Sequence, residues 1–156
     1  MCDYSLMGVP NRLAVPGDDL VVHRFEAGVL GMVAPFDIEA RREGSKKEAF
    51  WPKLKQFFKQ EPDVPAVCIP PGSRLIVRDI PQELQRTCGL ANHIGEAVFT
   101  QLTVEACAFR DAVRFNNGTE ILLQSFAEGQ RVRVLSVSSD EEETEPEYSG
   151  ITVGTA

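Results

Sequence analysis

Residues 112–135, AVRFNNGTEILLQSFAEGQRVRVL, indicate the fold class most clearly. Apolar runs at 112–115 and 120–124 flank Asn116-Asn117-Gly118, and Asn-Gly supplies the positive φ angles that a type I′ hairpin turn requires. A second turn at 127–130 leads into residues 131–135, where basic and apolar side chains alternate. The stretch therefore predicts a three-stranded antiparallel meander.

Working outward from this stretch, the same signals predict further strands. A phrase in which Pro-Gly precedes a β-branched run occurs at 16–23 and again at 71–78, with a looser copy at 128–134. Together these runs predict a mainly β fold, a small antiparallel β-barrel or half-barrel of about seven to eight strands. One inserted amphipathic helix and one short helix at 81–88 complete it. The other strands are expected at 20–25, 29–34, 66–69, 75–78 and 97–104.

Length and composition favour one domain. The chain has 156 residues and a net charge of −7, which disfavours a surface that grips nucleic acid. No long apolar run and no signal-peptide pattern is visible, so we expect a cytoplasmic protein whose four widely spaced cysteines stay free. We divide the chain into a β-rich domain at 1–137, with a basic and aromatic helical insertion at 35–65, and an acidic flexible tail at 138–156, where six acids fall within eight residues.

The insertion differs in character from the rest of the chain. Residues 41–59 carry net charge +5, so the remainder carries −12. Because Pro52 suits the first turn of a helix, we expect a helix that begins near Trp51. One face of this helix is lysine-rich, including Lys53 and Lys55, and the other is apolar, with Phe50, Leu54, Phe57 and Phe58.

So short a helix is only marginally stable alone in water, so another surface is expected to bury its apolar face, and three such surfaces are possible. The first is the protein's own barrel, with the lysines simply solvated. The second is the groove of another protein, with Trp51, Phe57 and Phe58 as anchors and Lys53 and Lys55 beside them. The third is an anionic membrane surface. A nucleic-acid role ranks last, because the acidic remainder of the chain would repel phosphate.

Cys2 and His23 are the candidate residues for chemistry. Removal of Met1 would expose an N-terminal cysteine whose free α-amine could act as a base, as in N-terminal nucleophile enzymes. A buried structural thiol is the other interpretation of Cys2. His23 shares its strand face with Val21 and Phe25, the expected inner face, which favours a core histidine. The alternative groups Cys2, His23 and Cys68 as a zinc or copper site; otherwise no cofactor is expected.

Several phrases carry a family resemblance. They are Cys2-Asp3-Tyr4-Ser5-Leu6, the run AVCIPPG at 66–72, FTQL at 99–102 and DAVRFNNG at 111–118. Together they resemble a family of small, uncharacterised bacterial proteins that open with the same five residues, over most of residues 1–136. The resemblance implies a bacterial source but no activity, cofactor or partner, and members lack about 25 residues of the insertion.

No catalytic motif is recognisable, so two functions are carried forward. The first is a non-enzymatic accessory or interaction subunit that docks on a larger bacterial protein assembly through the inserted helix and the tail. The second is a cysteine-dependent enzyme or metal-binding protein that uses Cys2, His23 and Cys68. The oligomeric state is left open by the sequence.

Overall fold

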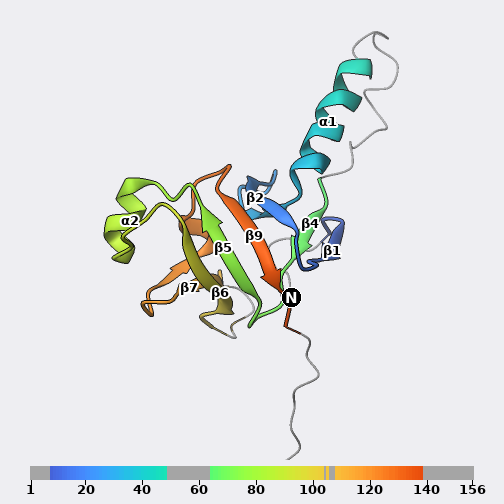
Figure 1. Cartoon of the computed structure of the whole chain (residues 1–156). Coiled ribbons are helices and arrows are strands. Elements are labelled where there is room, and N and C mark those ends of the chain that lie inside the picture. The colour runs from blue at the N-terminus through green and yellow to red at the C-terminus, as the bar shows by residue number, and fades with distance from the viewer. Residues whose placement is uncertain (1–7, 49–63, 104, 106–107, 139–156) are drawn as a thin grey trace, which may run out of the picture.

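The computed structural model describes residues 8–48, 64–103, 105 and 108–138 (Figure 1). In chain order the elements are β1 (Asn11–Leu13), β2 (Asp19–Arg24), β3 (Leu30–Val33), α1 (Pro35–Glu48), β4 (Ala66–Cys68), β5 (Arg74–Arg78), α2 (Gln82–Cys88), β6 (Gly95–Gln101), β7 (Asp111–Phe115), β8 (Glu120–Leu122), the 3-10 turn η2 (Leu123–Ser125) and β9 (Arg131–Ser136). No helix in the described part of the chain has the length and apolar character that a membrane crossing requires.

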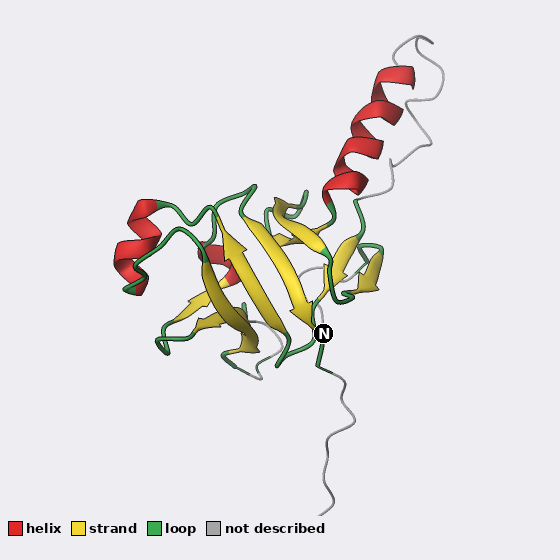
Figure 2. Ribbon diagram, in the orientation of Figure 1, coloured by secondary structure: helices red, strands yellow, loops and turns green. Residues whose placement is uncertain are grey.

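Seven strands form one antiparallel sheet in the order β3-β2-β9-β5-β6-β7-β8. The sheet curls on itself into a half-barrel, with α1 projecting from one side and α2 at another (Figure 2). The expected fold class is therefore confirmed: the chain is mainly β, with a short helix where 81–88 predicted one. That helix ends because Gly89 adopts a left-handed conformation at φ 63°.

The recurring turn phrase marks the centre of the sheet. Gly17, Gly72 and Gly129 each precede one of the strands β2, β5 and β9, and each has φ between 86° and 92°. An L-residue rarely adopts this angle, so glycine is required for the tight turn into each strand. The three strands that follow are direct neighbours, in the order β2-β9-β5.

The position of β9 corrects the predicted meander. Strands β6, β7 and β8 do form one, but β9 does not pair with β8; it lies between β2 and β5. The turn η2 and the buried Phe126 carry the chain away from β8 across the open side of the half-barrel. Val132 and Val134 of β9 are consequently buried at the centre of the sheet.

The β7–β8 turn is not of type I′ as expected. Only Gly118, at φ 85°, has a positive φ, and the loop holds three residues between Phe115 and Thr119. The Phe115 N–H donates to the Thr119 carbonyl at 2.9 Å. Asn117 instead uses its side chain: Oδ1 accepts from the Thr119 N–H at 3.0 Å, and Nδ2 donates to the Cys88 carbonyl. This amide ties the hairpin to the end of α2, which the dipeptide alone did not indicate.

Strands β1 and β4 form a separate, parallel pair. The sequence pattern predicts no strand at the position of β1. An ion pair joins β1 to the turn before β2: Arg12 Nη1 and Nη2 lie 2.8 and 3.2 Å from the two carboxylate oxygens of Asp18. Asp18 Oδ2 also accepts from the Val15 N–H at 2.9 Å. Hydrogen bonding from Arg12 is the largest cause that lowers the pKa of Asp18, and partial burial opposes it.

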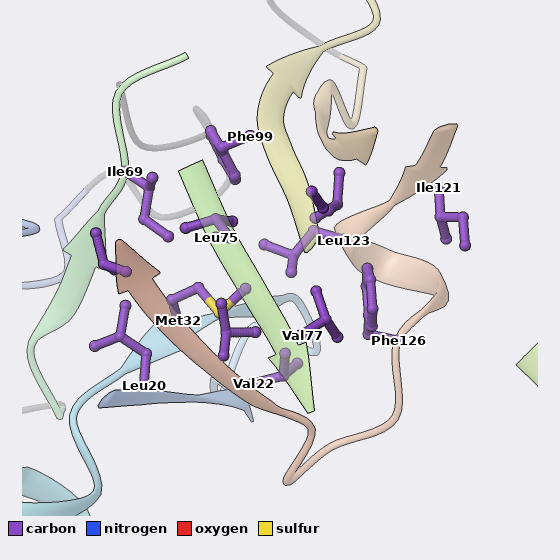
Figure 3. Packing of buried hydrophobic residues seen from close by; sticks show 14 of the residues in the cluster. Leu20, Val22, Met32, Ile69, Leu75, Val77, Phe99, Ile121, Leu123 and Phe126 are labelled. Carbon is purple, nitrogen blue, oxygen red and sulfur yellow. The ribbon is translucent and has the colours of Figure 1, made fainter. Parts of the chain in front are cut away.

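Two hydrophobic clusters cover the two faces of the β2–β3 hairpin. The main cluster fills the half-barrel, and Figure 3 shows side chains from the sheet and from η2 converging in it. The second lies on the other face of the hairpin and contains Phe25, Val29, Val33, Val64 and Ala66. Alternation along β2 assigns its residues: Leu20 and Val22 belong to the main cluster, whereas Val21 packs against the second.

A side chain closes the curl of the sheet. Strand β3 is one edge, and β8 with η2 is the other. Gln124 in η2 pairs with the backbone of Leu30 in β3 as a neighbouring strand would: its Oε1 accepts from the Leu30 N–H at 2.9 Å and its Nε2 donates to the Leu30 carbonyl at 2.8 Å. One amide thus satisfies two backbone groups at the edge of the core, which would be costly to leave unpaired.

We predict that Gln124→Ala lowers the free energy of unfolding by about 2–3 kcal/mol, because both Leu30 groups lose their partner in a part-buried position. Gln124→Glu should also destabilise, because a carboxylate cannot donate to the Leu30 carbonyl. Gln82→Ala, at an exposed position of α2, is the control and should change stability by less than about 0.5 kcal/mol. Chemical denaturation measures all three; a loss in Gln124→Ala no larger than in the control would contradict the closure.

The Arg12–Asp18 pair predicts a pH-dependent contribution to stability. Because the pKa of folded Asp18 is lowered from 3.8, its charge stabilises the fold above that value and loses this effect as the pH falls through the folded pKa. At neutral pH, Asp18→Asn should cost about 0.5–1 kcal/mol, an estimate that allows for the partly exposed Arg12. Denaturation at a series of pH values should show the wild-type advantage shrinking in acid; a constant advantage would contradict this role of the charge.

Candidate functional site

A small pocket lies at the open side of the half-barrel. It encloses about 20 Å³, room for one water molecule. The pocket lining is apolar apart from Asp111, Met32 and Cys68. The lining residues come from β3, from β4 and the segment that follows it, and from β6, β7 and η2. The lining residues are Leu30, Gly31, Met32, Val67, Cys68, Ile69, Phe99, Asp111 and Leu123.

Asp111 is the charged residue of this pocket. It begins β7 and is 8% exposed. Its Oδ1 accepts a hydrogen bond from Gln101 Nε2 at 3.0 Å, across the β6–β7 ladder in which these two residues are direct partners. A buried carboxylate needs such donors, because burial without them is costly. The pair therefore stabilises the polar end of a pocket that is too small for an organic substrate.

Cys68 corrects the expectation that the cysteines are free. It ends β4, lines the pocket and is disulfide-bonded. A disulfide sulfur is not a thiolate, so Cys68 could act as a nucleophile or as a thiolate ligand only after reduction. Cys88, in contrast, is a free buried thiol at the end of α2, and burial raises its pKa. Cys88 belongs to the main hydrophobic cluster, and its backbone carbonyl accepts hydrogen bonds from Asn117 Nδ2 and Thr119 Oγ1.

His23 lies on the face of β2 that it shares with Val21 and Phe25, as predicted. This face meets the second cluster, however, and not the main core. The imidazole packs edge-on against Phe25 with ring centres 5.2 Å apart, and its Nδ1 lies 3.8 Å from Glu128 Oε1. The side chain remains 21% exposed, so His23 is a partly buried surface-facing histidine and not a fully enclosed one.

The structure does not test the proposed metal site. Cys2 lies outside the described residues, and within them no group of three or more His, Cys, Asp or Glu side chains is arranged to hold a metal ion. His23 contacts Phe25 and Glu128, whereas Cys68 lines the pocket. The site at Cys2, His23 and Cys68, with its zinc or copper, stays a prediction.

The predicted partner-binding residues also lie outside the described residues. They are Trp51, Phe57, Phe58, Lys53 and Lys55, together with the helix start expected near Trp51. Of the insertion, the structure describes α1, which begins at Pro35, and residues 64–65, of which Val64 belongs to the second cluster. Proline fits the first helical position because its missing N–H would have no partner there, and Asp37 adds a favourable charge to the first turn.

Two residues near the beginning of α1 contact the body of the domain. Ile38 packs against the second cluster, and Arg41 Nη2 lies 3.4 Å from Glu26 Oε1. Phe36, at the first turn, is 75% exposed. Beyond these residues Arg42 and Glu43 are exposed, and α1 extends away from the sheet (Figure 1). α1 is a different segment from the amphipathic helix expected near Trp51, which lies outside the described residues.

Two polar interactions that stabilise the sheet and β1 were not identified from the sequence. One is Gln124, whose closure of the sheet has no local signal. The other is the Arg12–Asp18 pair, because Asn11–Leu13 is too short to show strand alternation. An indirect clue to the latter is Asp18 in the turn after Pro16-Gly17, since aspartate in a turn commonly accepts from nearby backbone N–H groups, as it does here from Val15.

Comparisons with models of protein families, with curated proteins and with solved structures find no match for this chain. The resemblance to the bacterial family that opens Cys-Asp-Tyr-Ser-Leu therefore stays a prediction.

Proposed function

We propose that the chain is a non-enzymatic interaction subunit that docks on a larger protein through the insertion at 35–65 and the acidic tail. The observation that carries the proposal is the position of α1, which extends away from the curled sheet (Figure 2). Ile38 and Arg41 anchor its first two turns. Arg42 and Glu43, the next two residues, are exposed and belong to neither cluster, so this part of the helix calls for another role.

The composition of α1 supports this role. Its sequence, PFDIEARREGSKKE, is largely charged, so α1 gains little stability from burial beyond the contact of Ile38. A helix of 14 residues is also marginal on its own in water. A partner surface that pairs with the charges of α1 would stabilise it.

The enzyme or metal-binding alternative rests on one further observation, that Cys68 and the buried Asp111 line one pocket. It requires a reduced Cys68, and its N-terminal form requires removal of Met1. Intact-mass analysis that finds Met1 retained would exclude the N-terminal form. Metal analysis of the reduced protein that finds no stoichiometric zinc or copper would exclude the metal form.

We predict that deleting residues 41–59 leaves the body folded. Ile38 and the second cluster are retained, and among the described residues the deletion removes the ion pair of Arg41 with Glu26, whose side chains are 32% and 78% exposed. The melting temperature should change by less than about 4 °C, since a surface pair contributes under about 1 kcal/mol. Thermal unfolding followed by circular dichroism measures it. A collapse of the transition would show that the deleted segment belongs to the core.

Site-specific photo-crosslinking in native cells tests the docking itself. A photoreactive amino acid at Arg42 of α1 should form one dominant heavier adduct, whereas the same amino acid at Arg86 of α2 should not. Both positions are exposed arginines on helices, so the pair is matched in residue type and accessibility. Absence of an adduct at Arg42, or equal adducts at both positions, would contradict docking through α1.

A further inference from the structure

The turn between β7 and β8 contains a chemically labile pair of residues. Asn117 is followed by Gly118, and both are exposed to water. Because glycine has no side chain, its nitrogen can approach the side-chain carbon of a preceding asparagine without hindrance. A bond then forms between Gly118 N and Asn117 Cγ, the bond from Cγ to Nδ2 breaks, and ammonia leaves with the amide proton. Water opens the resulting cyclic imide to aspartate or isoaspartate, so the reaction needs no other reactant.

The native contacts of this turn oppose the reaction. The attacking group is engaged, because the Gly118 N–H donates to the Phe115 carbonyl at 2.8 Å. The side-chain amide is engaged at both of its atoms: Asn117 Oδ1 accepts from the Thr119 N–H at 3.0 Å, and Nδ2 donates to the Cys88 carbonyl. Ring closure therefore requires that the Asn117 side chain first leave the end of α2.

The end of α2 in turn depends on this amide. Cys88 is the last residue of α2, where a carbonyl has no partner within the helix. Asn117 Nδ2 and Thr119 Oγ1 donate to this carbonyl, the latter at 3.3 Å, and Nδ2 also lies 3.5 Å from the Gly89 carbonyl. A carboxylate at position 117 could not donate, and its charge would face these carbonyls at the negative end of the helix. The product would therefore not dock again.

From these contacts we infer that Asn117 is a modification site whose deamidation is a one-way switch for the end of α2. Deamidation is slow while the side chain holds α2, and once it has occurred it keeps the helix end apart from the hairpin. The residue that this opening uncovers is Cys88, a free thiol that is 1% exposed in the closed form. Helices α1 and α2 lie on different sides of the sheet (Figure 1), so this inference does not rest on docking through α1.

The rate of the reaction is measured on the purified full-length protein by peptide mass spectrometry, in native buffer and in guanidinium chloride. Asn117 should convert at least about tenfold more slowly in the folded protein, because only the fraction with an open helix end reacts. Asn116 is also exposed but is followed by an asparagine, so it is the internal control and should convert more slowly than Asn117 in the unfolded chain. Equal rates for Asn117 under the two conditions, or no conversion in the unfolded chain, would overturn the inference.

The effect of the product is measured with Asn117→Asp. Cys88 is alkylated with iodoacetamide under native conditions, and its peptide is identified by mass. Labelling should be at least about fivefold faster than in the wild type, because the helix end opens more often. Asn116→Asp is the matched control: it adds the same charge to the neighbouring exposed position and should label at the wild-type rate.

Hydrogen exchange of the β9 amides separates opening of α2 from unfolding of the whole chain, and it should be the same in both variants. If Asn117→Asp does not fold, wild-type protein that has deamidated in native buffer takes its place after separation from the intact form by anion exchange. A folded product whose Cys88 is no more reactive than in Asn116→Asp, or whose β9 amides exchange faster as well, would contradict the switch.

Discussion

The amide of Gln124 joins the two edges of the curled sheet. An antiparallel sheet of seven strands has two edges, and the curl brings β3 close to η2 without giving them enough strand to form a ladder. Gln124 supplies the missing pairing with the carbonyl and N–H of Leu30. The apolar side chains behind it, including Leu123 and Phe126, are then enclosed from a side that no strand covers.

Local features of the fold were predictable because their causes are local. Glycines that must adopt positive φ mark the turns before β2, β5 and β9, and alternation marks the strands themselves. The order of the strands was not predictable, because β9 lies between β2 and β5 and pairs with residues more than 50 positions away in the sequence. The same holds for β1, whose partner β4 is over 50 residues away and whose three residues carry no pattern.

The candidate site was less predictable than the fold, for a chemical reason. Strand alternation correctly grouped His23 with Val21 and Phe25, but it could not say that a second cluster covers that face. Cysteine spacing carries no information on pairing, so the disulfide of Cys68 could not be read from the sequence. The burial of Asp111 in the pocket depends on Gln101 across the ladder and on η2, which contributes Leu123 to the lining.

The character of α1 limits how the insertion could dock. Where the structure describes it, α1 offers Arg42 and Glu43 to solvent and its apolar Ile38 to its own body, so this part of the insertion supplies charge and not buried apolar area. Charge complementarity speeds encounter and selects partners more than it tightens complexes, and it weakens with salt. Tight docking would therefore need apolar anchors as well. Within the insertion those are available in the stretch that holds Trp51, Phe57 and Phe58, which follows α1 in the sequence. Under the proposed docking, α1 would direct the approach and the aromatic stretch would hold the partner.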